Sequence, residues 1–401
     1  MTEKDFLPSA YPSPKDEGIV RWKSPSNIAL IKYWGKKPQQ IPANPSISFT
    51  LNDCATDTQL SYRRLTSTSP RMPSETSSGT TLNKSSSITA SDESSSTKPS
   101  EKTARSPAPA GKFSFDLFFE GKLREDFRPK IETFFQRIER YLPFLREYHF
   151  KIETSNSFPH SSGIASSASG MSALALCLMS MEREFAPEMT EDFFKKKASF
   201  LARLGSGSAC RSIEGTLVQW GEHKNTKTSS NLYGIPYPYT THEIFDNYQD
   251  TILLVDEGQK QVSSTVGHDL MHGHPFAIQR FAQAHANLDD FRTILADGNL
   301  EEFIKIVESE ALTLHAMMMT SHPYFILMKP NTLEIIHRIW SFREASNTNV
   351  CFTLDAGANV HVLYPHNEKE TVYAFIKSEL LQFCQSEKHI CDRTGQGAQQ
   401  L

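Results

Sequence analysis

The sequence predicts an α+β fold, because strand-like and helix-like segments alternate along most of its 401 residues. The clearest evidence lies after residue 248, where a strand, helices, two strands and a helix suggest a compact α+β sandwich. A chain of this length can form two domains, or one large domain with insertions. Hydrophobic residues make up only 38%, which indicates that part of the chain lies outside the core.

A Ser- and Thr-rich segment at about 65–111 is predicted to be that part. About half of it is Ser or Thr, so it cannot bury enough apolar surface to offset its ordering entropy, and we expect a disordered surface insertion. Strand-like runs flank it at 58–62 and 113–119, which predicts a hairpin with a greatly lengthened loop. Phosphorylation or partner docking is an alternative role, and a tolerated insertion is favoured over it.

Apolar periodicity and capping residues define the other elements. Thr190 and Gly205 are suited to begin and end one helix, and Ile213, Leu217 and Trp220 would share one face of the next. The expected elements are a helix at 128–145, a strand at 150–154, helices at 166–183, 190–204 and 208–220, a strand at 248–255, helices at 275–296, 300–318 and 331–345, strands at 350–354 and 360–364, and a helix at 368–382.

Charge and cysteine content argue against several classes of protein. The 42 Lys and Arg against 46 Asp and Glu give a formal charge of −4, which does not suit a nucleic-acid-binding protein with a large basic face. The polar start lacks a signal region, and the longest apolar stretch, 173–179, is too short to span a bilayer. The six cysteines form no CxxC pair and are expected to be reduced thiols. We expect a soluble cytoplasmic protein without nucleic-acid or membrane partners.

Two loops rich in Gly and Ser are candidates for binding phosphate. The first, at 161–168, opens a helix whose free N–H groups and dipole favour an anion, although a Ser-capped helix start without a ligand is as good an interpretation. The second, at 205–212, carries Arg211 in its first turn, where a cation opposes the helix dipole unless an anion is bound. Tight connections with an Arg salt bridge are the alternative.

Two further segments place charged side chains after apolar strands. Lys32 and Lys36 could lie near one anionic ligand, with Tyr33 as a hydroxyl donor; solvated surface lysines are the alternative. Asp355 lies before a Gly turn, where a carboxylate can be held out of bulk water beside a lysine and act as a base or orienting group. An ordinary Asp turn residue is the alternative.

Together, these segments resemble the diphosphomevalonate decarboxylases of the GHMP small-molecule kinase superfamily. The resemblance spans nearly the whole chain except the N-terminal tail and the insertion. Its most specific motifs are Lys-Tyr-Trp-Gly-Lys at 32–36 and Ser-Ala-Cys-Arg-Ser at 208–212, and further motifs lie at 44–48, 159–170, 262–265 and 353–359. The resemblance implies a two-domain GHMP-kinase-like fold, with a ribosomal protein S5 domain 2-like part at 1–222 and a ferredoxin-like α/β sandwich at 223–401.

The resemblance also implies a reaction. ATP with Mg²⁺ would phosphorylate the 3-hydroxyl of mevalonate 5-diphosphate, and phosphate and CO₂ would then leave to give isopentenyl diphosphate. Asp355 would accept or orient the hydroxyl proton beside Lys32, while Arg211 and Ser208 hold the substrate carboxylate. Other implied site residues are Asn27, Tyr33, Lys36, Lys130, Ser206, Ser263 and Ser264 for the substrate, and Ser161, Ser162, Gly163, Ala165, Ser166 and Ser167 for ATP. No protein ligand to a metal is expected, and a homodimer is implied by the resemblance alone.

Two positions depart from the family pattern, and one is His160-Ser161-Ser162 in the first loop, where relatives often have Thr and Ala. Lys130 stands where the family usually has an Arg that reaches the diphosphate, with Arg128 as an off-register alternative. The histidines at 268, 272 and 274 have metal-like spacing, but structural or surface roles are favoured. Cys210 is expected to pack between its loop and the following helix.

Two other functions compete with decarboxylation. One is a kinase of the same fold that phosphorylates a mevalonate derivative without decarboxylating it. The other is a catalytically silent binding protein that uses the insertion for docking. The joint presence of Asp355, Lys32 and Arg211 favours the decarboxylase.

Overall fold

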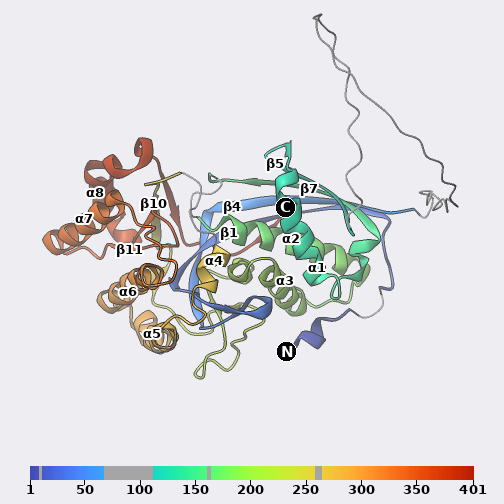
Figure 1. Cartoon of the computed structure of the whole chain (residues 1–401), viewed down its shortest axis with the longest axis horizontal. Helices are drawn as coiled ribbons and strands as arrows, with labels where there is room; N and C mark the ends of the chain where they lie inside the picture. The colour runs from blue at the N-terminus through green and yellow to red at the C-terminus, as the bar shows by residue number, and fades with distance from the viewer. Residues whose placement is uncertain (9–10, 67–111, 160–163, 258–263) are drawn as a thin grey trace, which may run out of the picture.

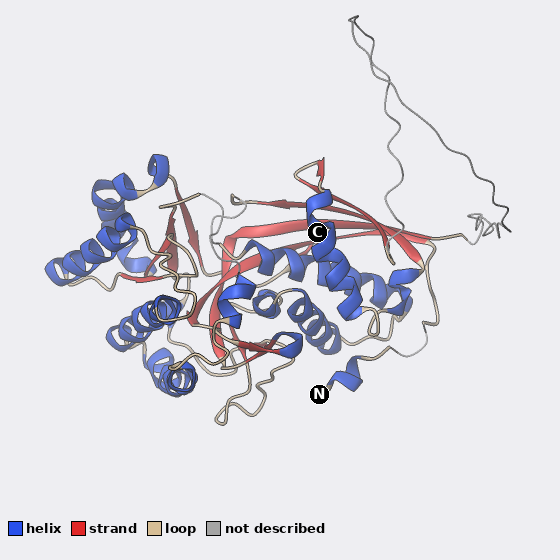
Figure 2. Ribbon diagram, viewed as in Figure 1, coloured by secondary structure: helices blue, strands red, loops and turns tan. Residues whose placement is uncertain are grey.

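The computed structural model of the protein describes residues 1–8, 11–66, 112–159, 164–257 and 264–401. The predicted Ser- and Thr-rich insertion lies almost wholly outside these residues. The described chain forms two lobes, each with its own sheet, which confirms the expected two-domain α+β architecture (Figure 2). No described helix is long and apolar enough to cross a membrane.

A large sheet builds the first lobe. Its strands run in the order β14–β1–β4–β7–β5–β6, and β8 and β9 extend it beside the first part of β4. The two long strands β1 and β4 pair antiparallel over most of their length. The bounds are β1 Glu17–Ile31, β4 Ser46–Arg64, β5 Ser114–Phe119, β6 Lys122–Leu123, β7 Tyr148–Asn156, β8 Leu217–Trp220, β9 Ile235–Pro236 and β14 Gln399–Gln400.

Helices cover one face of this sheet (Figure 1). Helix α2 (Ser166–Phe185) packs on β1 and β4, α3 (Glu191–Gly205) packs on α2, and α1 (Arg128–Ile138) packs on α3. The predicted cap of α3 is confirmed, because the Thr190 hydroxyl accepts a hydrogen bond from the amide of Phe193. A short hairpin of β2 (Lys36–Lys37) and β3 (Ile41–Pro42) follows β1.

The second lobe contains an antiparallel sheet in the order β11–β12–β10–β13. Its elements are α4 Ser264–Asp269, α5 Ala277–Asp297, α6 Leu300–Met319, α7 Pro330–Ser346, α8 Lys369–Phe375, β10 Gln249–Leu253, β11 Cys351–Thr353, β12 Val360–Tyr364 and β13 His389–Arg393. After α8 the chain continues as a π-helical turn and a 3₁₀ turn to Phe383. The predicted helix at 368–382 is therefore present in three segments.

The predicted hairpin between 58–62 and 113–119 is wrong. Both runs are strands, but β7 lies between them: it pairs antiparallel with β4 and parallel with β5. The chain passes from β5 through α1 to β7, so a crossover connection joins β5 to β7. Strand β5 therefore forms no hairpin with β4. The alternation along β5 correctly identified a half-buried strand, but alternation does not identify the neighbouring strand.

The predicted helix at 208–220 is also wrong. A 3₁₀ turn, Gly207–Ser212, is followed by Gly215 at a φ of 91° and then by β8. A φ in this range ends any right-handed helix, and glycine adopts it at little cost. The helix predicted at 128–145 ends at Ile138, and a separate 3₁₀ turn follows at Pro143–Arg146.

A shared apolar cluster joins the two lobes. It contains Leu30 of β1 and Phe49 of β4 from the first lobe, with Phe291 of α5, Val307 of α6 and Ile252 of β10 from the second. Buried apolar contact of this kind holds packed elements in a fixed arrangement. The end of β1 is thereby placed against α6.

Candidate active site

A cleft of about 620 Å³ lies where the two lobes meet. Both lobes contribute charged or hydroxyl side chains to it. Its polar lining residues are Lys32, Tyr33, Lys36, Gln40, Lys130, Thr133, Arg137, Ser166, Ser167, Ser206, Ser208, Arg211, His268 and Asp355. The sequence predicted a set of site residues, and most of those within the described part of the chain therefore line one cavity.

The Lys32–Asp355 contact crosses between the lobes. Lys32 follows β1 and its side chain is only 1% exposed, whereas Asp355 follows β11 and its side chain is 32% exposed. The ammonium lies 3.3 Å from Asp355 Oδ1. Burial lowers the pKa of Lys32 below its ordinary value, and the neighbouring carboxylate of Asp355 opposes that change. The cleft therefore holds a buried cation in contact with a partly exposed carboxylate.

Arg211 is buried against the floor of the cleft. Its guanidinium donates hydrogen bonds to the Ser46 hydroxyl and to Asn27 Oδ1, and burial lowers its pKa. Asn27 in turn donates to the Ser208 carbonyl and the Ser212 hydroxyl. Asn27 is not among the lining residues; it contacts Arg211 from behind. The guanidinium is thus oriented by neutral partners, which leaves its charge available to an anion.

The loop before Arg211 packs closely on Tyr33. A Cβ atom added to Gly207 would lie 2.8 Å from the Tyr33 hydroxyl, so this approach requires glycine. The Tyr33 hydroxyl is buried without a hydrogen-bond partner in the described part of the chain, and burial raises its pKa. Cys210 is buried, but it packs against Tyr33 and Trp220 of β8 and not against a following helix, and burial raises its pKa to about 12. The thiol is therefore not an activated nucleophile.

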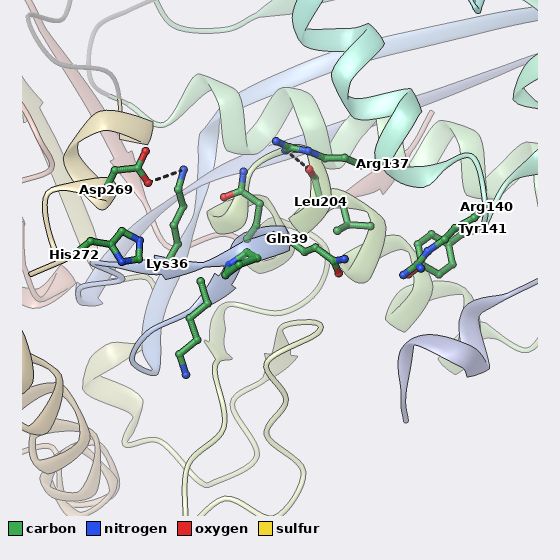
Figure 3. A pocket seen from close by; sticks show the side chains of 11 residues that line it. Lys36, Gln39, Arg137, Arg140, Tyr141, Leu204, Asp269 and His272 are labelled. Atoms are coloured by element: carbon green, nitrogen blue, oxygen red, sulfur yellow. Dashed lines mark hydrogen bonds and ion pairs between the residues drawn. The ribbon is translucent and has the colours of Figure 1, made fainter.

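A side pocket of about 570 Å³ adjoins the cleft (Figure 3). It shares Lys36, Gln40 and Arg137 with the cleft and adds Lys37, Pro38, Gln39, Arg140, Tyr141, Leu204, Asp269 and His272. Lys36 lies 3.9 Å from Asp269, and Arg137 donates to the Leu204 carbonyl. Burial lowers the pKa of Lys36, and the charge of Arg137 lowers it further. The cations at this junction favour an anionic ligand.

Arg137 was missed by the sequence analysis, which named Lys130 and Arg128 on the same helix. Lys130 and Arg137 both line the cleft, but Arg128 does not. Arg128 instead pairs with Glu125 and donates to the Phe115 carbonyl. Arg137 lies seven residues after Lys130, which is two helical turns along α1, so both side chains can face the cleft. This spacing is the signal in the sequence that could have indicated Arg137.

Helix α2 begins at the cleft. Ala165 precedes it in the left-handed region, with a φ of 37°, and Ser166 and Ser167 line the cavity. The Ser167 hydroxyl lies 3.1 Å from that of Ser206. A helix N-terminus with free N–H groups favours phosphate. Among the predicted residues, Ser161, Ser162, Gly163 and Ser263 lie outside the described residues, and Ser264 is placed only as the first residue of α4.

Two of the three spaced histidines have structural contacts, and His272 lines the side pocket. His268 is buried between the rings of Tyr33 and Trp34 and accepts a hydrogen bond from the Gly35 amide at 3.0 Å. Burial lowers its pKa to about 3, so its ring is neutral. His274 contacts the Met317 carbonyl. Within the described ranges, no three His, Cys, Asp or Glu side chains are grouped to hold a metal ion.

Family models match most of the chain. Residues 24–231 match the diphosphomevalonate decarboxylase-like N-terminal domain, and residues 251–400 match the mevalonate 5-diphosphate decarboxylase C-terminal domain. The diphosphomevalonate decarboxylase of Gibberella zeae is 26% identical over 354 residues, which cover 87% of this chain and 81% of the relative.

Solved structures share the fold. The mevalonate diphosphate decarboxylase of Staphylococcus aureus has a TM-score of 0.73 at 22% identity, and the match covers 96% of this chain and 98% of that one. MDDEF in complex with MVAPP, AMPPCP and magnesium has a TM-score of 0.73 at 23% identity, with coverage of 96% and 99%.

Proposed function

The chain belongs to the diphosphomevalonate decarboxylase family, and we propose that its cleft catalyses ATP-dependent decarboxylation of mevalonate 5-diphosphate to isopentenyl diphosphate. The other products are ADP, phosphate and CO₂. The observation that carries this proposal is the Lys32–Asp355 contact in a cleft that also holds the buried Arg211. A tertiary alcohol, a carboxylate and a diphosphate need a base, a fixed guanidinium and further cations, and each is present in this cavity.

Asp355 accepts the proton of the substrate 3-hydroxyl as that oxygen becomes phosphorylated. Lys32 lies beside the Asp355 carboxylate and stabilises negative charge on the transferring phosphoryl group. Support for these roles comes from the 3.3 Å contact and from the burial of Lys32, which strengthens its electrostatic effect.

Arg211 holds the substrate carboxylate in the plane required for decarboxylation. When the C3–O bond to the phosphate breaks, the electron pair of the bond between the carboxylate carbon and C2 forms the new double bond, and CO₂ leaves. Bidentate binding fixes a carboxylate plane, which a point charge does not. Ser208 contributes a hydroxyl at the same end of the cleft.

The cations at the side pocket bind the 5-diphosphate. Lys36 and Arg137 both line the side pocket in Figure 3, and Tyr33, whose hydroxyl has no hydrogen-bond partner among the described residues, lines the adjoining cleft. Lys130 adds a fourth donor from the exposed side. A diphosphate carries enough oxygen atoms to accept hydrogen bonds from all four.

ATP binds at the start of α2. MDDEF binds MVAPP with AMPPCP and magnesium, and here the N-terminus of α2 and the hydroxyls of Ser166 and Ser167 fit a triphosphate. Mg²⁺ bound with the triphosphate would neutralise part of its negative charge. The predicted residues Ser161, Ser162 and Gly163 would add backbone donors, and Ser263 and Ser264 would line the site from the second lobe.

The test is to measure CO₂ release and phosphorylated product in parallel from ATP and mevalonate 5-diphosphate. We expect CO₂, phosphate and ADP in equal amounts, and none without ATP. Phosphorylated mevalonate 5-diphosphate without CO₂ would instead support the kinase alternative.

Assembly and location are separate predictions. A homodimer is implied by the family resemblance alone, whereas a cytoplasmic location is an expectation from the composition of the sequence. Light scattering after gel filtration would test the dimer. A monomeric mass for the active enzyme would contradict it.

A further inference from the structure

A buried ion pair of the second lobe binds the backbone of Lys32. Arg280 on α5 and Glu310 on α6 are each 0% exposed, and the guanidinium contacts both carboxylate oxygens. Glu310 Oε2 accepts a hydrogen bond from the Lys32 amide at 2.8 Å, and Arg280 Nη2 donates to the Lys32 carbonyl at 3.1 Å. Asn287 also donates to Glu310 Oε1. The pair therefore satisfies both backbone polar groups of one residue in the other lobe.

The same helix holds the chain at Asp355. His315 lies five residues after Glu310, and its Nε2–H donates to the Asp355 carbonyl at 3.1 Å. Burial lowers the pKa of His315 to about 4, so the ring is neutral near pH 7. Helix α6 thus holds the main chain on both sides of the Lys32–Asp355 contact.

From this geometry we propose that Glu310 and Arg280 are positioning residues, which fix the two lobes so that the Lys32 ammonium meets the Asp355 carboxylate. Neither residue lines the cleft, so they act through Lys32. The inference rests on the proposed function, because it takes Lys32 and Asp355 as the reacting pair. The alternative is a pair that only stabilises the fold.

The Glu310 carboxylate also affects the pKa of Lys32. Burial lowers the pKa of Lys32, and the carboxylates of Asp355 and Glu310 oppose that change. Loss of the Glu310 charge lowers this pKa further, and the unpaired Arg280 cation acts in the same direction. Among the described residues, the charged or titratable groups that face Lys32 are Asp355 after β11, Glu310 and His315 on α6, Arg280 on α5, Arg211 on the 3₁₀ turn and Asp250 on β10.

The first test replaces the pair by Glu310→Met with Arg280→Met in the full chain. Apolar replacement of a whole buried pair often preserves stability, whereas removal of one partner does not. The matched control is Glu182→Met with Lys197→Met, a buried pair of the first lobe at 2.6 Å. We expect a folded variant with KM values for both substrates near wild type and kcat lower by roughly 10- to 10²-fold, while the control keeps wild-type kcat.

Wild-type kcat in a folded Glu310→Met/Arg280→Met variant overturns the proposal. Absence of ATP-dependent CO₂ release from the wild-type enzyme counts against the proposed function instead, so the two failures are distinguishable.

If the methionine pair does not fold, Arg280→Lys keeps the buried charges paired but loses the fork that contacts both Glu310 and the Lys32 carbonyl. Its kcat should again fall, and wild-type kcat overturns the proposal. The second test, Glu310→Gln, measures the effect of the Glu310 charge in a folded variant. Glutamine keeps the shape and still accepts from the Lys32 amide, but it lacks the charge. Because Lys32 then loses its proton at lower pH, the alkaline limb of the kcat profile should move down by about one pH unit. A lower alkaline limb supports the proposal, and wild-type kcat together with an unmoved limb overturns it.

Discussion

The cleft has two ends that differ in exposure. Lys32 and Arg211, near Asp355 at the end proposed for phosphoryl transfer and decarboxylation, are almost completely buried. Lys130 and Arg137, at the end proposed to bind the diphosphate, are exposed. At the first end, Asp355 of the second lobe contacts the Lys32 ammonium, and Ser46 and Asn27 of the first lobe accept hydrogen bonds from Arg211. At the second end, the cations extend from the surface of α1 and from the β2–β3 hairpin. Buried charges act at short range in a low dielectric, and exposed charges are screened by salt. We therefore expect substitutions at the first end to lower kcat and those at the second to raise KM.

Asp355→Asn should have the largest effect. It preserves the shape of the side chain but removes the carboxylate that accepts the hydroxyl proton, so kcat should fall by about 10²- to 10⁴-fold. Equilibrium binding of ATP and mevalonate 5-diphosphate should change little. Steady-state kinetics with calorimetric binding measures both quantities, and turnover within a few-fold of wild type would exclude the proposed role of Asp355.

Arg211→Lys should have the next largest effect. Lysine retains the charge but cannot make the two parallel hydrogen bonds that fix a carboxylate plane, so turnover should fall by roughly 10²-fold. ATP affinity should stay near wild type, because the start of α2 is a separate element. Phosphorylation could persist while CO₂ release drops, and parallel product assays would detect this. An equal loss of ATP affinity and turnover would assign this loop to the nucleotide.

Arg137→Gln tests the exposed end. Loss of one charge-assisted hydrogen bond to the diphosphate should raise KM for mevalonate 5-diphosphate about tenfold and leave kcat nearly unchanged. The effect should shrink as ionic strength increases, because exposed charges are screened. Arg128→Gln, on the same helix but paired with Glu125, should have little effect on KM. A larger rise in KM from Arg128→Gln would mean that Arg128 leaves Glu125 to bind the substrate.

The two ends also differ in how much the sequence revealed. Lys32, Arg211 and Asp355 lie in short motifs next to strand ends or Gly turns, so local patterns were enough to select them. Arg137 belongs to a helix with several basic residues, and only its orientation toward the cleft distinguishes it. The contact between Lys32 and Glu310 joins residues 278 positions apart, and the placement of β7 between β4 and β5 is likewise non-local. Periodicity indicates which face of an element is buried, but not which element covers it.

Deletion of residues 67–107, closed by a short turn, should have the smallest effect. The segment has almost no large apolar side chains, so its loss removes little burial, and loop-closure entropy changes slowly with length. Neither Thr66 nor Lys112, at the flanks of the insertion, lines the cleft. We therefore expect kcat, KM and melting temperature near wild type, measured by steady-state kinetics and thermal unfolding. A rise in KM with unchanged kcat would show that the segment contributes to the exposed end of the cleft. A fall in kcat in a folded variant would show that it reaches the buried end, and the contrast between the two ends would then need revision.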